Sequence, residues 1–394
     1  MNGSLRFPRR RRPDRARSCA VAFVAAGLAG TLLGPASAAA LASASAAPAA
    51  AITGELAGVS CVSASSCLAV GVNAPLDGPS TPLAEKWNGA TWTASAAPSP
   101  ASATNAAFYA VTCTAAANCL AVGSYFIAAS HQALPLAEKW NGSKWTIQAV
   151  PAPSGVSQAT LLAVACPAAT SCRATGNAGT KTLAENWNGS KWSIVPSANA
   201  NSGKPNVLSG LACSSASSCW SVGYWFPGSD TGSLTEKWNG SKWTVVSTPS
   251  TSSGQLISTA CASASDCLAV GLTDKLFGLA QRWNGSTWTN TKLATVVATS
   301  TELNSVTCVS TTACESVGSY STSSNTGALA EKWAGTKWTL QKTPAINGSS
   351  YATLDGISCA SASYCWAVGM QVKSSGTSAP LLEKWNGSAW SIPG

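Results

Sequence analysis

The chain has 394 residues, with 24 Lys and Arg against 15 Asp and Glu, 15 cysteines and a single histidine, His131. Chemistry that needs several histidines is therefore excluded. The formal charge of +9 is uneven, because residues 1–45 hold seven arginines and one acid and leave 17 basic and 14 acidic residues for the rest. No basic block remains after residue 45, so we expect no nucleic-acid partner.

Residues 1–45 are ordered like a secretory signal. A head of seven arginines precedes an apolar stretch from Cys19 to Gly34, and small residues follow with A-x-A at 36–38 and again at 42–44. This order indicates export and cleavage. The apolar stretch is shorter than the roughly 20 residues that span a bilayer, so a retained anchor is the lesser alternative. We predict a secreted, extracellular protein without membrane contact after cleavage, and leave association with the cell wall open.

Residues 46–394 contain seven copies of one repeat. In the first copy, C-V-S-A-S-S-C-L-A-V-G is followed after a gap by L-A-E-K-W-N-G-A-T-W-T. The copies cover about residues 55–102, 107–155, 160–203, 207–254, 255–300, 302–349 and 351–394. Each has two tryptophans separated by four residues, namely Trp87/Trp92, Trp140/Trp145, Trp187/Trp192, Trp238/Trp243, Trp283/Trp288, Trp333/Trp338 and Trp385/Trp390. A period near 50 residues with short strands is typical of a propeller.

Fourteen cysteines form one pair per copy, with five residues between the two members. The pairs are Cys61/Cys67, Cys113/Cys119, Cys166/Cys172, Cys213/Cys219, Cys261/Cys267, Cys308/Cys314 and Cys359/Cys365. In an exported protein such pairs indicate disulfides. Zinc is the alternative, but its sites use shorter cysteine spacings and further ligands. We predict seven local disulfides, no metal and no cofactor.

Each copy divides into four short strands bounded by Gly, Pro, Asn and Ser. In the first copy these cover about 56–61, 67–71, 83–88 and 91–96. The two cysteines lie at strand ends, on either side of a five-residue turn between the first and second strands. Asn88-Gly89 starts a tight hairpin between the third and fourth strands. Four antiparallel strands in each of seven copies predict an all-β, seven-bladed propeller, since one sheet cannot bury both faces alone. The last copy is short, so residues 47–53 could add an edge strand to it.

Along a copy, a strand ending in V-G is followed by a variable loop, a strand ending in W-N-G, a turn, a W-T strand and a final proline. This order resembles kelch-type repeats of galactose-oxidase-like propellers. The resemblance covers about residues 55–394 and implies the same fold. The double glycine of kelch repeats is a single glycine here, and cysteine pairs are not a kelch feature. Repeats with such pairs are also similar to those of secreted bacterial proteins, which supports the location only.

The loop between the second and third strands varies among the copies. It holds 11, 12, 6, 10, 7, 10 and 11 residues, whereas the other two turns of each copy have constant lengths. Binding residues usually lie on variable loops held by a rigid scaffold. The candidate binding residues are therefore Tyr125, Phe126, His131, Tyr224, Trp225, Phe226, Asp230, Asp274, Lys275 and Phe277. Aromatic side chains there could also pack beneath their own loops.

The repeated residues suit structural roles instead. Six copies place a glutamate before the first tryptophan, as in Glu85, and the fifth places Gln281 there. We expect these groups to accept an indole or backbone N–H, the tryptophans to fill the blade cores, and the lysines that follow to pair locally or stay solvated.

We predict a non-catalytic binding protein, expected to be a monomer, that contacts a glycan or a cell-surface protein through its variable loops. A glycoside-active or other extracellular enzyme is one alternative, because Asp230, Asp274, Glu302, Glu315 and Asp355 are not repeated. Nothing in their spacing brings two of them together, so no catalytic residue is assigned. A structural or adhesive envelope component is the other alternative.

Overall fold

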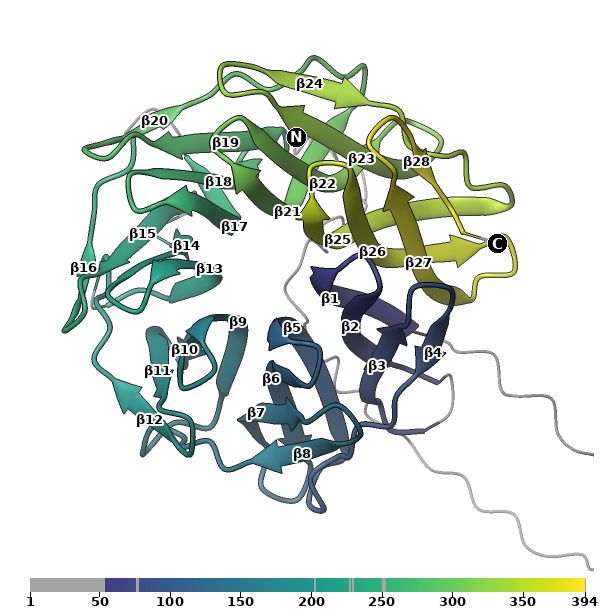
Figure 1. Ribbon diagram of the computed structural model, residues 1–394. Helices are drawn as coiled ribbons and strands as arrows, with labels where there is room; N and C mark the ends of the chain where they lie inside the picture. Colours follow the sequence, from purple (N-terminus) through teal and green to yellow (C-terminus); the bar gives the residue numbers. More distant parts are fainter. Residues whose placement is uncertain are drawn as a thin grey trace, which may run out of the picture. The chain divides into compact units, whose positions relative to one another are not determined.

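The computed structural model describes residues 54–75, 78–201, 203–226, 228, 230–249 and 253–393. The predicted signal, residues 1–45, and the predicted extra edge strand, residues 47–53, lie outside this part of the chain. Residues 51–394 form one compact unit. Its described residues form no helix, and their strands build seven four-stranded antiparallel blades around a ring (Figure 1). The prediction of an all-β, seven-bladed propeller is confirmed.

Each blade consists of four consecutive strands. The first strands, nearest the centre of the ring, are β1 (Gly54–Ser63), β5 (Asn105–Ala115), β9 (Ala159–Ala168), β13 (Asn206–Ser215), β17 (Gly254–Ser263), β21 (Ser300–Ser310) and β25 (Ser349–Ser361). The second strands are β2 (Ser66–Asn73), β6 (Asn118–Ile127), β10 (Ser171–Ala178), β14 (Ser218–Trp225), β18 (Asp266–Thr273), β22 (Ala313–Ser321) and β26 (Tyr364–Lys373).

The outer half of each blade is shorter. The third strands are β3 (Thr81–Trp87), β7 (Gln132–Trp140), β11 (Lys181–Trp187), β15 (Gly232–Trp238), β19 (Gly278–Trp283), β23 (Thr326–Trp333) and β27 (Ser378–Trp385). The fourth strands are β4 (Trp92–Ala94), β8 (Trp145–Gln148), β12 (Trp192–Val195), β16 (Trp243–Val245), β20 (Trp288–Asn290), β24 (Trp338–Gln341) and β28 (Trp390–Ser391). Strands pair in chain order, and one parallel bridge, Thr326 to Tyr351, joins blades 6 and 7.

The cysteine hairpin differs from its predicted form. Cys61 and Cys67 lie opposite each other inside β1 and β2, whose pairing continues to Ser63 and Ser66, so the turn has two residues instead of five. The seven predicted disulfides are present, each with 4.0 Å between its Cα atoms. Each disulfide therefore links two adjacent strands directly.

The cysteines lie in the core, which corrects their predicted position at strand ends beside a turn. The second cysteine of each pair is buried within a core cluster, because it lies on the second strand and faces a neighbouring blade. These seven residues are Cys67, Cys119, Cys172, Cys219, Cys267, Cys314 and Cys365. Their half-buried partners pack against the same clusters and are Cys61, Cys113, Cys166, Cys213, Cys261, Cys308 and Cys359. The disulfides are therefore part of the blade packing.

The turn between the third and fourth strands has four residues. Trp87 pairs with Trp92 across it, and the Asn88 side-chain oxygen accepts hydrogen bonds from the backbone N–H groups of Ala90 and Thr91, both at 2.9 Å. Gly89 has a φ of +100°, a value that suits glycine because it lacks Cβ. The Asn-Gly pair thus fixes where the third strand ends and sets the two tryptophans side by side.

The hydrophobic core lies between neighbouring blades. Leu68 and Val70 of blade 1, for example, pack with Phe108, Trp140 and Trp145 of blade 2. The tryptophan pairs are in ring contact in every blade. They supply most of the large apolar surface in a chain rich in Ala, Ser and Thr. Their predicted role as blade core is confirmed.

The ring closes between blades 7 and 1 through the same contacts that join the other blades. Trp366 and Val368 pack with Leu56 and Trp87. A Cβ added to Gly356 would lie 2.9 Å from the Cα of Gly58, so the first strands approach closely there. Among the described residues, each blade takes all four strands from one repeat, and no strand crosses the junction.

Candidate functional site

The two rims of the ring are built differently. On one rim, here called the turn rim, the cysteine hairpins meet the Asn-Gly turns, as where the indole N–H of Trp87 donates to the carbonyl of Ala64 at 3.0 Å. The other, the variable rim, carries the loops between second and third strands together with the connections between blades. There the N–H of Ala106 donates to the carbonyl of Ser80 at 3.0 Å. All length variation among the repeats therefore falls on one rim.

Two grooves open on the variable rim, and each lies over a blade with a short loop. The first, of about 660 Å³, lies at blade 3 between residues 153–157 and 194–199. The second groove, of about 500 Å³, lies at blade 5 and is lined by Asp274, Lys275, Phe277 and Leu293 among others. No cysteine lines either groove. The loops of these blades have six and seven residues, against 10 to 12 elsewhere. Both grooves therefore lie where a short loop stands between longer ones.

Blade 5 presents its candidate residues on a tight turn. Asp274 accepts hydrogen bonds from the N–H and the hydroxyl of Thr231 in blade 4, which ties the two loops together. Lys275 is exposed, and Phe277 is 47 % exposed. Leu276, which the sequence analysis missed, is 49 % exposed and has a φ of +63°.

Blade 4 presents its aromatic residues less openly. The rings of Tyr224 and Phe226 meet edge to face, with 5.5 Å between centroids. The indole of Trp225 lies over Gly232, close enough that a Cβ there would be 2.4 Å from its nitrogen. These side chains pack partly beneath their own loop, whereas Asp230 is exposed.

The candidates of blade 2 lie apart from those of blades 4 and 5, because blade 3 stands between them. Tyr125 packs against the core between blades 1 and 2, and Phe126 is half-buried. His131 is exposed at the loop tip with a φ of +53°. The structure therefore ties the loops of blades 4 and 5 to each other through Thr231 and Asp274 and leaves the candidates of blade 2 separate.

A second place where the copies differ is the centre of the ring. Every first strand has a β-bulge four residues before its first cysteine, and the bulged residues are Ala57, Tyr109, Leu162, Ser209, Ile257, Asn304 and Asp355. A bulge inserts a residue that has no cross-strand partner. The strand pattern alone gave no sign of it.

Carboxylates from blades 6, 7 and 1 interact near one of these bulges, that of Asp355. Asp355 accepts a hydrogen bond from the Asn304 amide at 2.9 Å and another from the Thr353 hydroxyl at 3.0 Å. Burial, together with the nearby charges of Glu55 and Glu302, raises the pKa of Asp355 to about 7. Asp355 and Glu302 were both unrepeated acids in the sequence, whereas Glu55 was not recognised as their neighbour.

The repeated glutamates are buried structural groups, as predicted, but none accepts an indole. Glu236 accepts the backbone N–H of Ala198, and Glu331 that of Ala294, each at 3.0 Å. Both donors lie six residues after the last tryptophan of the preceding blade. In the blades before Glu138, Glu185 and Glu383, the residue six positions after the last tryptophan is a proline, which has no N–H to donate. Neither carboxyl oxygen of these three glutamates has a hydrogen-bond partner. Burial raises the pKa of each of the three to about 8.

Most of the basic residues after these glutamates reach the next blade, and two of them also pair within their own blade as predicted, Arg282 with Asp266 and Lys332 with Glu315. Five lie 5.2 to 5.8 Å from the first tryptophan ring of the following blade, namely Lys86, Lys237, Arg282, Lys332 and Lys384. Blade 3 has Asn186 instead of a basic residue at this position. Its cross-strand partner Arg173 supplies the cation, with the guanidinium carbon 4.6 Å from the ring of Trp238 in blade 4. These cations join neighbouring blades.

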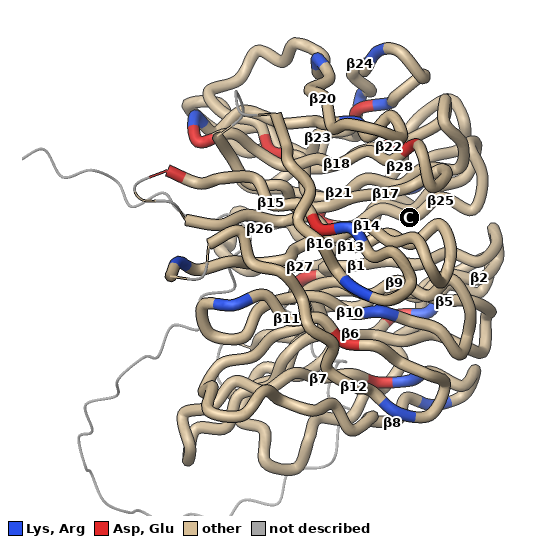
Figure 2. Tube along the Cα trace, turned by 90° about the vertical axis from the view of Figure 1, so that its left-hand side faces the viewer, with Lys and Arg blue, Asp and Glu red and all other residues tan. Residues whose placement is uncertain are grey.

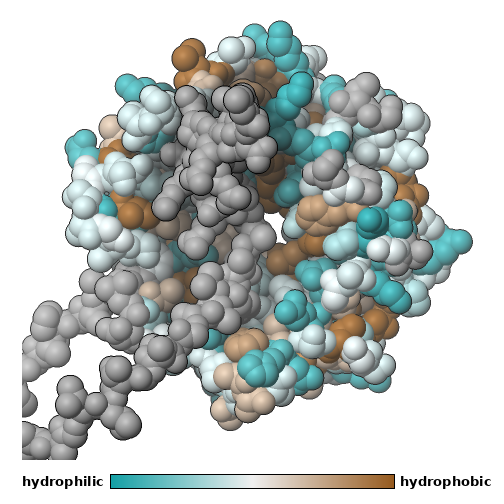
Figure 3. Space-filling view, turned by 180° about the vertical axis from the view of Figure 1, so that it is seen from behind, coloured by the Kyte–Doolittle hydropathy of each residue, from teal (hydrophilic) through white to brown (hydrophobic). Residues whose placement is uncertain are grey.

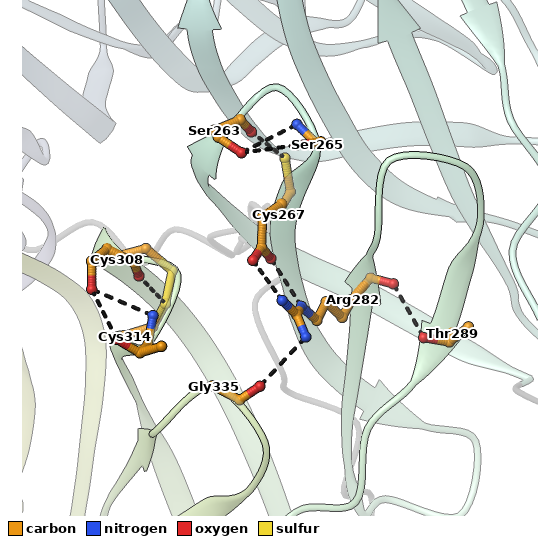
Figure 4. Close-up of polar contacts among 11 residues, drawn as sticks. Ser263, Ser265, Cys267, Arg282, Thr289, Cys308, Cys314 and Gly335 are labelled. Carbon is orange, nitrogen blue, oxygen red and sulfur yellow. Dashed lines mark hydrogen bonds and ion pairs between the residues drawn. A yellow bond between two sulfur atoms is a disulfide. The ribbon is translucent and has the colours of Figure 1, made fainter.

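Arg282, on the third strand of blade 5, also links the cysteine hairpin of its own blade to the tryptophan turn of blade 6, as Figure 4 shows. Its guanidinium donates two hydrogen bonds to Asp266, at 2.9 and 2.6 Å, and a third to the carbonyl of Gly335 in blade 6, at 3.4 Å. Both arginines after residue 45 therefore have structural roles.

The described residues hold no group of three or more His, Cys, Asp or Glu placed to bind a metal ion. No helix long and apolar enough to cross a membrane occurs among them.

Comparison with known proteins identifies the fold class. No protein-family model and no curated protein matches the chain. Solved β-propellers match over most of its length at low identity. YCF48 from Cyanidioschyzon merolae is 11 % identical with a TM-score of 0.53, over 86 % of this chain and 97 % of that one. YCF48 bound to D1 peptide is 14 % identical with a TM-score of 0.51, over 85 % and 92 %.

A polysaccharide lyase of family PL25, an ulvan lyase bound to a sugar chain, is similar to the same extent. It is 7 % identical with a TM-score of 0.53, over 86 % of this chain and 96 % of that one. At such identities the likeness shows the propeller fold alone.

Proposed function

We propose that this chain is an exported, non-catalytic binding propeller that acts as a monomer and contacts a polypeptide or glycan at the cell surface through the variable rim of blades 3 to 5. The observation that carries this proposal is the confinement of all loop variation to one rim, where two grooves lie on either side of blade 4. A rigid ring with variable loops on one face is the arrangement that binding scaffolds use.

The disulfides support export. Seven of them, one in each blade, form and persist in an oxidising compartment. The signal-like order of residues 1–45 agrees with this. Propellers of similar fold bind a peptide, in YCF48, and a sugar chain, in the ulvan lyase. The kelch-like kind of repeat stays a prediction, since these likenesses identify propellers only in general.

Export is tested by expressing the full chain in a bacterial host and sequencing the N-terminus of the protein in the medium. We expect it to begin just after one of the two A-x-A sites, at residue 39 or 45. A protein that stays inside the cell with residues 1–45 attached would contradict the proposal.

Binding is tested with the secreted protein on arrays of displayed peptides and of glycans. Phe277→Ala removes an exposed ring beside the blade 5 groove and should weaken binding about tenfold, the loss typical of an interface anchor. Leu340→Ala, on the fourth strand of blade 6, removes a side chain of similar exposure, 51 %, away from the grooves and should leave binding unchanged. Equal effects of the two variants would contradict a site on the variable rim.

Hydrolysis of a glycan is a second candidate function. The observation that favours it is the gathering of Asp355, Glu302 and Glu55 near the ring centre, with the pKa of Asp355 at about 7. A carboxyl group with such a pKa suits a general acid beside a second carboxylate. Release of reducing ends from a polysaccharide that is lost in Asp355→Asn, with the fold retained, would establish this function in place of simple binding.

A further inference from the structure

The turn between β18 and β19 has the same hydrogen bonds as the turn between β26 and β27. In blade 5 the N–H of Thr273 donates to the carbonyl of Phe277, and the N–H of Leu276 donates to that of Thr273, both at 2.8 Å. In blade 7 the N–H of Lys373 donates to the carbonyl of Thr377 at 2.9 Å, and the N–H of Gly376 to that of Lys373 at 2.8 Å. The chain therefore contains two versions of one turn.

The two versions differ at the position with positive φ. Blade 7 places Gly376 there, with a φ of +84°, whereas blade 5 places Leu276 there, with a φ of +63°. This conformation brings Cβ close to the following carbonyl in any residue except glycine, and it costs roughly 1–2 kcal/mol. Blade 5 thus carries a strain that the same turn avoids in blade 7.

Packing within the molecule does not explain why a leucine occupies this position. Leu276 is 49 % exposed and Phe277, the next residue, is 47 % exposed, and neither belongs to any core cluster of the described residues. Blade 7 has Gly376 and Thr377 at the same two positions. Backbone strain held in place by surrounding hydrogen bonds is typical of functional sites. Two adjacent large apolar side chains held on such a turn can bury apolar surface against a partner.

The variable rim as a whole exposes more basic than acidic side chains, whereas Lys275 and Asp274 balance each other in charge at this turn itself. Lys275 is exposed next to the two side chains, whereas the carboxylate of Asp274 is held by Thr231. Elsewhere on the variable rim, Lys181, Lys204 and Lys373 are exposed, and Asp230 is the other exposed acid of the rim within the described ranges. Figure 3 views the ring from the side opposite to Figure 1, and the part of this face that grey atoms leave uncovered shows separate hydrophobic patches among hydrophilic residues. A partner must therefore match small apolar anchors within a basic surface.

We propose that Leu276 and Phe277 form a rigid apolar anchor, defined by these two residues, that binds an acidic polypeptide segment carrying apolar side chains. The anchor favours a polypeptide over a sugar, because only Phe277 offers a ring for stacking and neither side chain can hydrogen-bond to hydroxyl groups. Holding the anchor on a fixed turn lowers the ordering cost of binding. This inference rests on the proposed binding role of the variable rim and names the class of its partner.

The test uses the secreted protein, a displayed library of random peptides and an array of neutral and acidic glycans. Leu276→Gly should raise the melting temperature by roughly 2 °C, because it relieves the strained φ, and should weaken peptide binding about tenfold. The reciprocal variant, Gly376→Leu in blade 7, is the matched control. It should lower the melting temperature by a similar amount and leave peptide binding unchanged.

The outcomes separate this inference from the proposed function. Selected peptides rich in Asp, Glu and apolar residues, together with weaker binding by Leu276→Gly, would support the anchor. Peptides that bind Leu276→Gly as well as the original chain, or ligands found only among the glycans, would overturn the anchor and leave a binding rim. Failure of every peptide and glycan to bind would overturn both.

Discussion

A buried carboxyl group at the same position of six blades is the most unusual feature at the scale of single residues. The carboxyl group is hydrogen-bonded where the preceding connection offers an N–H, at Ala198 and Ala294, and has no partner at Glu138, Glu185 and Glu383, where that connection places a proline. Blade 5 follows Pro249 and has Gln281 instead of glutamate. A neutral amide there has the shape of a protonated carboxyl group. We infer that the glutamates without an N–H donor are protonated in the folded protein near neutral pH.

Protonation of this kind makes stability depend on pH. The folded pKa of Glu138, about 8, lies above its ordinary value of 4.5. The folded state therefore binds a proton that the unfolded state releases, and stability is fully present below about pH 4.5 and falls as the pH rises through 8. Each such group contributes a slope of up to about 1.4 kcal/mol per pH unit in that window.

Glu138→Gln should remove one of these titrations. We expect the free energy of unfolding, measured by urea denaturation, to match the original chain near the acidic end of the window and to exceed it near the alkaline end. Measurement at both ends provides the control, since a general packing defect would lower stability at every pH. An unchanged pH slope in this variant would show that Glu138 is ionised in the folded state.

At the scale of strands and turns, most features followed from the repeat. The constant spacing of cysteines and tryptophans indicated paired strands, and the Asn-Gly turns indicated where they end, because these turns depend on local chemistry. The two-residue cysteine turn and the bulge before it were missed. Both depend on the register between strands, which neighbouring blades set through contacts such as that of Gly58 with Ala110.

The candidate site was predictable in part for the same reason. Variable loop lengths pointed to the rim on which both grooves lie, and Asp274, Lys275 and Phe277 line one of them. Leu276 was missed because a search for aromatic and charged residues passes over a leucine. Comparison of T-D-K-L-F in blade 5 with K-S-S-G-T in blade 7 would have found it. The carboxylates near Asp355 come from blades 1, 6 and 7, and only closure of the ring places them together.

The disulfide hairpin is the element whose stability can be tested most directly. Replacing both Cys213 and Cys219 by alanine removes one closed loop of the unfolded chain and should lower the free energy of unfolding by about 2 kcal/mol. Urea denaturation checks this value. Reduction of the original chain, which opens every bridge, should lower stability much further. If the original chain unfolded at the same urea concentration with and without reductant, the disulfides would contribute nothing to stability.

The exposed charge of the whole ring is more positive than its composition suggests. Ten lysines are exposed, namely Lys144, Lys181, Lys191, Lys204, Lys242, Lys275, Lys292, Lys337, Lys342 and Lys373. Asp230 and Asp274 are the exposed acids of the described ranges, since the repeated glutamates are buried. In the side view of Figure 2, acidic positions lie mainly within the sheets and basic ones are common at the loops and turns. The near-neutral sequence after residue 45 therefore folds into a basic surface, which favours acidic partners.

The shape of this surface depends on closure of the ring. Closure can be tested with two equivalent hydrogen bonds, one between consecutive blades and one between the first and last blades. The Ser60 hydroxyl accepts the N–H of Cys113 at 2.9 Å between blades 1 and 2, and the Ser358 hydroxyl accepts the N–H of Cys61 at 3.0 Å between blades 7 and 1. The two serines precede the first cysteine of their own blades. Each bond should contribute about 1 kcal/mol.

Ser60→Ala and Ser358→Ala should therefore destabilise the protein equally, by about 1 kcal/mol each in urea denaturation. Ser60 joins blades that are consecutive in the chain and keep their contact in any arrangement, whereas the bond to Ser358 exists only when the first and last blades meet. Destabilisation by Ser60→Ala alone would mean that the ring is open in solution, and the gathering of Glu55 with Glu302 and Asp355 would then be lost as well.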